Sequence, residues 1–159
     1  FVDLDHEIET CAGIAISIIF ACEGESGFRR CECETLAQVL SRESSVVATG
    51  GGAVLDPGNR ALIRRHGFVV HLDIDLDEQL HRLARDRRRP LMVGADRSEV
   101  LARLPAERGP LYAEVADLTF PPAGMSPTDA AEQLAERLQD LWRCPDRALS
   151  GNPAPSEPI

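Results

Sequence analysis

A run of three glycines is the first stretch whose residue types point to chemistry. The segment 44–49, SSVVAT, is typical of a buried strand, and Gly50, Gly51 and Gly52 follow it directly. Consecutive glycines cost backbone entropy, so a group that must approach the main chain closely would explain them. Their amides could then donate hydrogen bonds to a ligand with no side chain in the way. The alternative interpretation is a tight turn without a ligand.

Two aspartates near the start of the sequence form a second candidate group. Asp3 and Asp5 lie in FVDLD, which has the pattern of a short strand that ends in acids. Side chains alternate along a strand, so both carboxylates are expected on the same side. In such a pair, one carboxylate could bind a metal ion and the other could bind a substrate hydroxyl. The alternative is a solvated strand end.

Arginines supply the third group. Arg29 and Glu32 are three residues apart in a predicted helix, close enough for Glu32 to orient the guanidinium. Arg89 and Arg108 are expected in loops beside prolines. The chain contains no lysine, so all 17 of its Lys and Arg residues are arginine. Arginine suits bidentate recognition of carboxylate and phosphate groups, which makes these arginines candidates for binding an anion.

The elements that must position these groups alternate along the chain. Strands are expected at 1–5, 44–49, 68–74 and 117–120. Helices are expected at 26–42, 57–66, 76–86, 98–116 and 126–143, with interruptions at Pro105 and Pro110 in the fourth of them. This alternation predicts an α/β fold with a parallel sheet flanked by helices, and ligand sites at the carboxyl ends of the strands.

Composition limits the classes of function. The chain has 159 residues and a formal net charge of -9, which argues against nonspecific binding to nucleic acid or to an anionic membrane. No apolar run approaches the ~20 residues that a bilayer requires. The 5 cysteines do not form an obvious disulfide framework, which favours a reducing cytoplasm. Without lysine, this chain has no Schiff-base chemistry and no phosphate-loop lysine.

A series of motifs occurs in one order along the chain. They are DLDHEIE, G-x-x-I-x-x-I-F over residues 13–20, GESGFRRCE, ATGGGAV, RRRPLM and ERGPLY. Together they resemble shikimate kinase, from residue 1 to about residue 141. The resemblance implies a fold like that of the nucleoside-monophosphate kinases. It also implies transfer of the γ-phosphoryl group of ATP to the 3-hydroxyl of shikimate, with Mg2+, in the biosynthesis of chorismate and aromatic amino acids.

The resemblance further implies roles for single residues. Arg29 and Arg108 match the arginines that grip the shikimate carboxylate, and Glu32 matches the acid that steadies Arg29. Asp5 matches the aspartate that holds the reacting hydroxyl, and Asp3 matches the aspartate near the magnesium. The remaining matches are the glycine run that lies against shikimate (Gly50, Gly51 and Gly52), the apolar walls of the pocket (Phe20 and Phe28) and the lid arginine over the phosphates (Arg89).

The family pattern begins with a strand, a G-x-x-G-x-G-K-[ST] loop and a helix that this sequence does not contain. We therefore expect an N-terminally truncated domain over residues 1–143, with a lid at about 85–96 and a disordered tail over 144–159. Because that loop and its lysine position ATP, little kinase activity is expected from this chain alone.

The resemblance makes shikimate, a small-molecule substrate, the expected partner of a monomer. Two other functions stay open. One is a non-catalytic module that binds shikimate and never had the phosphate loop. The other is a kinase of another small hydroxylated acid such as gluconate. The segments GFRR and ERGPLY disfavour the gluconate kinase, because they carry the arginines that match the carboxylate-binding pair of the shikimate enzymes.

Overall fold

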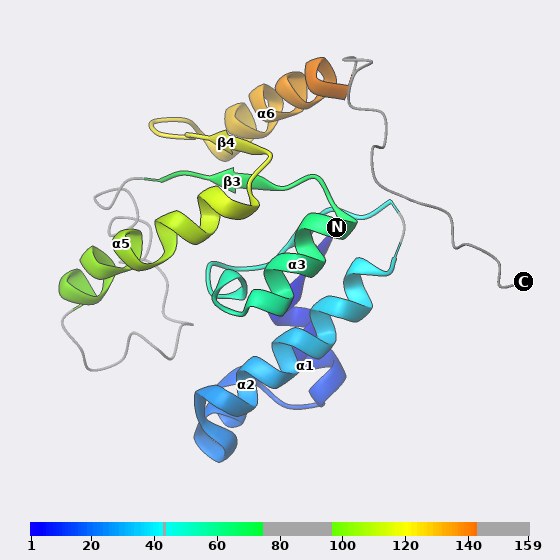
Figure 1. Ribbon diagram of the computed structural model, residues 1–159, viewed down its shortest axis with the longest axis vertical. Helices are drawn as coiled ribbons and strands as arrows, with labels where there is room; N and C mark the ends of the chain where they lie inside the picture. Colours follow the sequence, from blue (N-terminus) through cyan, green and yellow to red (C-terminus); the bar gives the residue numbers. More distant parts are fainter. Residues whose placement is uncertain (43, 75–96, 143–159) are drawn as a thin grey trace, which may run out of the picture. The chain divides into compact units, whose positions relative to one another are not determined.

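In the computed structural model, short parallel strands alternate with helices, which confirms the predicted α/β class (Figure 1). The structure describes residues 1–42, 44–74 and 97–142. The chain divides into two compact units, Phe1–Pro121 and Pro122–Ile159. The expected helix at 76–86, the lid at 85–96 and the tail at 144–159 lie outside the described residues, and the single domain over 1–143 stays a prediction.

The first unit contains all the described strands. They are β1 (Val2–Asp3), β2 (Val47–Ala48), β3 (Val70–Leu72) and β4 (Leu118–Phe120). Its helices are α1 (Leu4–Ala12), α2 (Ile16–Leu40), the short 3-10 helix η1 (Ala53–Leu55), α3 (Pro57–His66) and α5 (Arg97–Val115). The second unit contains α6 (Pro127–Trp142). The strands form two separate parallel pairs, with Asp3 opposite Ala48 in β1–β2 and Val70 opposite Leu118 in β3–β4.

The strand expected over residues 1–5 is wrong beyond Asp3. Asp3 is the N-cap of α1, and its Oδ1 accepts hydrogen bonds from the amides of Asp5 at 3.0 Å and His6 at 3.4 Å. A capping carboxylate satisfies amides that the first helical turn leaves without partners, so the chain turns helical at Leu4. Asp5 therefore lies in the first turn of α1, and strand alternation does not place it beside Asp3.

Helix α2 is bent at Gly24, whose backbone dihedrals are φ 68° and ψ -170°. The bend separates the first part of α2 from the part that carries Arg29 and Glu32, in agreement with the helix start expected at Ser26. Among the described residues, no single helix is long and apolar enough to cross a membrane. Only α1 and α2 together, as a pair bent by 93°, meet that criterion of length and composition.

Helix α5 continues through both of its prolines. The sequence predicts interruptions at Pro105 and Pro110, yet the helix runs from Arg97 to Val115. The interruptions are therefore wrong. Each proline removes one hydrogen bond from the helical ladder, and the bonds of its neighbours carry the helix across the gap. As a result Arg108 lies within a helix and not in a loop.

Buried side chains of α1, α2 and α3 form the core that positions α2. They are Leu4, Ile8, Ile19, Phe28, Leu36, Val39 and Ile63. Leu36 is fully buried, so Leu36→Ala is expected to lower the free energy of unfolding by about 2–5 kcal/mol through lost burial and the cavity left behind. Chemical denaturation measures this effect. Leu72, 51% exposed, is the control, and equal losses for Leu36→Ala and Leu72→Ala would contradict the assigned core.

Candidate functional site

The glycine run lies where β2 ends and η1 begins. Because β1 and β2 are parallel, the residues that follow them emerge at the same edge of the pair. Asp5 in α1 follows β1, and Gly50 follows β2. Gly50 has a φ of 72°, in the left-handed region that glycine adopts without strain. The sequence therefore placed the glycines correctly, at the carboxyl end of a strand.

The guanidinium of Arg29 fills the space beside Gly52. A Cβ atom built on Gly52 would lie 2.6 Å from Nη1 of Arg29 and 2.9 Å from Nη2, closer than real Cβ contacts allow. Glycine at this position therefore permits a cation to lie against the main chain. The close approach that the glycine run predicted is made, at least in part, by the protein's own arginine.

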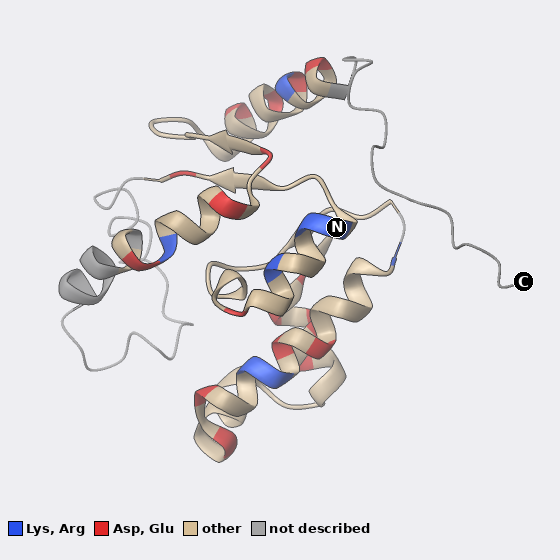
Figure 2. Cartoon of the chain, in the orientation of Figure 1, with Lys and Arg blue, Asp and Glu red and all other residues tan. Residues whose placement is uncertain are grey.

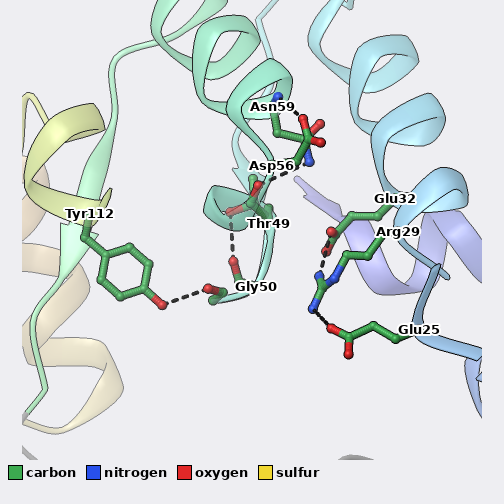
Figure 3. A network of polar contacts seen from close by, with 10 residues as sticks. Glu25, Arg29, Glu32, Thr49, Gly50, Asp56, Asn59 and Tyr112 are labelled. Carbon is green, nitrogen blue, oxygen red and sulfur yellow. Dashed lines mark hydrogen bonds and ion pairs between the residues drawn. The ribbon is translucent and has the colours of Figure 1, made fainter. Parts of the chain in front are cut away.

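Two carboxylates hold Arg29 in this position, as Figure 3 shows. Nη1 donates to Oε2 of Glu32 at 2.7 Å, and Nη2 donates to Oε1 of Glu25 at 3.2 Å. The contact with Glu32 was predicted. Glu25 was missed, although its spacing of four residues from Arg29 on a helix is a recognised signal for such a pair. A guanidinium has five N–H donors, so donors remain for an anionic ligand.

Four of the predicted residues interact through their charges around Glu32. Glu32 is 3% exposed. Burial raises the pKa of the Glu32 carboxyl, and the charge of Asp5 raises it further. The cations Arg29 and Arg108 act in the opposite direction, but the pKa remains raised overall. Burial acts to lower the pKa of Arg29, but the hydrogen bonds and charges of Glu32 and Glu25 outweigh it, so that pKa is raised. Asp5 and Arg108 therefore lie within electrostatic reach of the Arg29–Glu32 pair.

Helix α5 approaches the glycine run with Arg108 and Tyr112. A Cβ atom on Gly51 would lie 3.5 Å from Nη1 of Arg108 and 2.9 Å from the hydroxyl oxygen of Tyr112. The Nε of Arg108 is buried and has no hydrogen-bond partner within the part of the chain that the structure describes. An unpaired buried donor is costly, and an anion at this point would satisfy it. Tyr112 was missed, although it follows Arg108 by one helical turn.

An aromatic pair adjoins the guanidinium of Arg29 through the ring of Phe28. The rings of Phe20 and Phe28 stack with their centroids 4.8 Å apart. The Cζ atom of Arg29 lies 5.2 Å from the centroid of the Phe28 ring, within the range of a cation–π contact. The predicted apolar wall therefore adjoins the predicted cationic group.

Other predicted residues do not join this cluster. Arg89 lies outside the described residues. Asp3 is exposed and caps α1. Over residues 1–42, 44–74 and 97–142, no group of three or more His, Cys, Asp or Glu residues could hold a metal ion. Figure 2 shows that the blue arginine segment of α2 has red acidic segments on both sides, so the cation is locally balanced.

The assembled groups match the chemistry of a small hydroxylated acid. Guanidinium donors from α2 and α5 suit a carboxylate. Main-chain amides at the glycine run and the Asp5 carboxylate suit hydroxyl groups, which both donate and accept hydrogen bonds.

Comparisons with known proteins agree with this chemistry. The family model for shikimate kinase matches residues 1–139. A shikimate kinase of Stenotrophomonas maltophilia (strain R551-3) is 51% identical over 146 residues, which cover 92% of this chain and 81% of that protein. A shikimate kinase of Xanthomonas axonopodis pv. citri (strain 306) is 47% identical over 154 residues, or 97% of this chain and 83% of that protein.

Solved structures of two similar proteins have the same fold. The structure of shikimate kinase from Acinetobacter baumannii in complex with shikimate matches with a TM-score of 0.79 and 40% identity. That match covers 89% of this chain and 77% of the other. Shikimate kinase from Bacteroides thetaiotaomicron matches with a TM-score of 0.78 and 30% identity, over 89% of this chain and 82% of the other.

Proposed function

The chain belongs to the shikimate kinase family, and from this membership we propose that the glycine run, Arg29 and Arg108 form its shikimate site. Members of the family transfer a phosphoryl group from ATP to shikimate. The observation that carries the proposal is the convergence of two guanidinium groups from different helices on adjacent glycines, Arg108 beside Gly51 and Arg29 beside Gly52. A carboxylate at this point would accept hydrogen bonds from both cations.

The carboxylate of shikimate gives both arginines a partner. Arg29 already shares two of its nitrogens with Glu32 and Glu25, which fix the plane of the guanidinium before a ligand arrives. Arg108 contributes the buried Nε donor that no other group accepts in the described part of the chain. Charge-assisted hydrogen bonds of this kind are about twice as strong as neutral ones, so this pair supplies most of the affinity.

The hydroxyl groups of shikimate are assigned to Asp5 and the glycine run. An ionised carboxylate only accepts hydrogen bonds, so Asp5 would hold the 3-hydroxyl and take up its proton as the phosphoryl group is transferred. The amides of Gly51 and Gly52 would donate to the ligand. The stacked rings of Phe20 and Phe28 would border its apolar face.

ATP is the phosphoryl donor of the family, and Mg2+ is proposed to accompany it. Asp3, whose carboxylate caps α1 through its contacts with the amides of Asp5 and His6, is the residue proposed to lie near the ion. Mg2+ is usually held by one or two carboxylates together with phosphate oxygens, which one aspartate fits. Arg89 is proposed to contact the phosphates. The phosphate-loop lysine, which would contact the phosphates of ATP, is not among the residues of this chain.

The cellular location is proposed from the cysteines, and the oligomeric state is proposed with it. The described cysteines, Cys11, Cys22, Cys31 and Cys33, are free, which supports a reducing compartment such as the cytoplasm. We further propose that the chain acts as a monomer on a small-molecule substrate. Sedimentation measurements test the monomer directly.

Titration calorimetry with shikimate and with gluconate tests the proposed function. The folded chain is expected to bind shikimate with one site, and gluconate at least about tenfold more weakly, because only shikimate presents its hydroxyls on a rigid ring. Equal affinity for both acids would contradict the assignment of the site to shikimate.

Glu32→Gln tests the support of Arg29. The variant keeps a hydrogen-bond acceptor but loses the charge that holds Nη1, so the Kd for shikimate is expected to rise about tenfold. Since the pKa of Glu32 is raised, wild-type Glu32 takes up its proton at a higher pH than an ordinary glutamate. Protonation removes the anionic partner of Arg29, so wild-type affinity should fall as pH decreases through that pKa.

The pH profile of the Kd separates this effect from other titrations. Glu32→Gln should lack the component of the profile that Glu32 causes. Glu34→Gln, at an exposed position of the same helix, is the matched control and should keep the wild-type Kd and profile. Profiles of the same shape for Glu32→Gln and the wild type would show that Glu32 does not support the site.

A further inference from the structure

Side chains of α3 and α5 hold the carbonyl groups of the loop after β2. The hydroxyl of Tyr112 donates to the carbonyl of Gly51 at 2.8 Å. Nδ2 of Asn59 donates to the carbonyl of Ala53 at 3.1 Å. Nη1 of Arg60 donates to the carbonyl of Val54 at 2.9 Å. The loop therefore takes its shape from side chains of helices that follow it in the sequence.

The bond from Tyr112 determines where the next amide points. The described residues contain no cis peptide bond, so the peptide between Gly51 and Gly52 is planar and trans. In such a unit the N–H of Gly52 points opposite to the carbonyl of Gly51. Because that carbonyl points toward the Tyr112 hydroxyl, the Gly52 amide points away from α5. In Figure 3, Tyr112 and Arg29 approach the loop from opposite sides.

Tyr112 is itself held in place by its surroundings. Its ring stacks on the ring of His71 in β3, with centroids 4.6 Å apart and planes 22° apart. Helix α5 is tied to α3 by an ion pair between Nε of Arg60 and Oε2 of Glu114 at 3.0 Å. These contacts leave the hydroxyl little freedom to follow the loop if the loop moves.

Tyr112 also lies one helical turn after Arg108. Residues four apart share a helix face, and both side chains reach Gly51. The Tyr112 bond thus fixes the distance between the glycine run and the guanidinium of Arg108. The Tyr112 hydroxyl therefore determines both the direction of the Gly52 amide and the distance of the Arg108 guanidinium from the glycine run.

We propose that Tyr112 is a positioning residue of the acid-binding site. Its hydroxyl locks the Gly51–Gly52 peptide so that the Gly52 amide faces a ligand held by Arg29 and Arg108. The identity of that ligand rests on the proposed function, whereas the orientation of the peptide does not.

Tyr112→Phe removes the hydroxyl and keeps the ring on His71. The Kd for shikimate, measured by calorimetry, is expected to rise about 5-fold to 10-fold, since one neutral hydrogen bond is lost and the amide is no longer fixed. The matched control is Thr10→Val, which removes a hydroxyl that donates to the carbonyl of His6 at 2.9 Å in α1. The control should keep the wild-type Kd.

Nuclear magnetic resonance with glycine-selective amide labelling supplies a readout that does not depend on the ligand. In Tyr112→Phe the amide signals of Gly51 and Gly52 should shift, and in Thr10→Val they should not. Tyr112 is the only tyrosine in the chain, so a ring-labelled tyrosine gives one signal, and added shikimate should shift that signal.

Each outcome decides the proposal. A weaker Kd together with shifted glycine amides supports positioning by Tyr112. An unchanged Kd in a folded Tyr112→Phe overturns it. If the wild type binds no shikimate, the proposed function fails, and the glycine amides alone decide: a shift confined to Tyr112→Phe supports the locked peptide, and unshifted signals overturn it.

Discussion

Arg29→Ala is expected to raise the Kd for shikimate about 100-fold, which corresponds to about 3 kcal/mol. The guanidinium of Arg29 is the better-supported of the two cations at the glycine run, because Glu32 and Glu25 hold two of its nitrogens. Truncation removes the charge-assisted hydrogen bonds to the ligand carboxylate and leaves the space beside Gly52 empty. Titration calorimetry measures the change.

Arg30 provides a matched control for this prediction. It is the next residue on α2, is 65% exposed at its side chain and pairs with Glu23 at 2.8 Å. Arg30→Ala has the same change of net charge and should leave the Kd within about twofold, because surface ion pairs contribute little. Equal losses for Arg29→Ala and Arg30→Ala would show that only the overall charge matters.

A double variant distinguishes loss of shikimate binding from loss of the fold. Removing Arg29 leaves the buried carboxylate of Glu32 without its nearest cation, a change that costs several kcal/mol of stability in buried pairs. The double variant Arg29→Ala with Glu32→Gln removes both charges and avoids that penalty. It should fold and should still bind shikimate about 100-fold more weakly than the wild type. Wild-type affinity in this folded double variant would contradict the role of Arg29.

Gly52→Ala is expected to weaken shikimate binding at least about tenfold through a single methyl group. The added Cβ would lie 2.6 Å from Nη1 and 3.1 Å from Cζ of Arg29, so the guanidinium must move. The backbone itself accepts alanine, because Gly52 has φ -91° and ψ -17°, in the right-handed helical region. The variant should therefore keep its fold and lose affinity, which calorimetry and thermal unfolding together measure.

Gly67→Ala is the control for the added methyl group. Gly67 follows α3 with a φ of -148°, and the nearest atom to its built Cβ lies 3.8 Å away, an ordinary contact. This variant should bind shikimate as the wild type does. A Gly52→Ala protein with wild-type affinity would mean that the guanidinium of Arg29 has no fixed place against the main chain.

Local patterns in the sequence were sufficient to predict much of the geometry of the candidate site. A β-branched run before glycines predicted a strand followed by a close approach, and the structure has both at Gly50–Gly52. The three-residue spacing of Arg29 and Glu32 predicted their contact. These features depend on residues close in the sequence, where spacing determines geometry.

Errors arose in segments where two local preferences compete. Alternation in FVDLD favoured a strand, but Asp3 caps the helix that starts at Leu4, and this hydrogen bonding outweighed the alternation. The prolines of α5 favoured breaks, but the helix continues through Pro105 and Pro110. In both places the sequence showed the two competing preferences, but it did not show which of them would determine the backbone conformation.

The hydrogen bond between Tyr112 and Gly51 could not be predicted by spacing. The two residues are 61 positions apart, and the bond forms only because α5 packs beside η1. No periodicity in the sequence encodes which helix face meets which carbonyl. The sequence patterns therefore indicated the two cations of the candidate site and missed the hydroxyl that is bonded to its main chain.

The structure of this chain crystallised with shikimate tests the central claim most directly. We expect a carboxylate within hydrogen-bond distance of the guanidinium groups of Arg29 and Arg108, a ring hydroxyl on the carboxylate of Asp5, and the amide of Gly52 directed at the ligand. Shikimate bound with its carboxylate remote from both arginines would show that Arg29 and Arg108 do not form the acid-binding site.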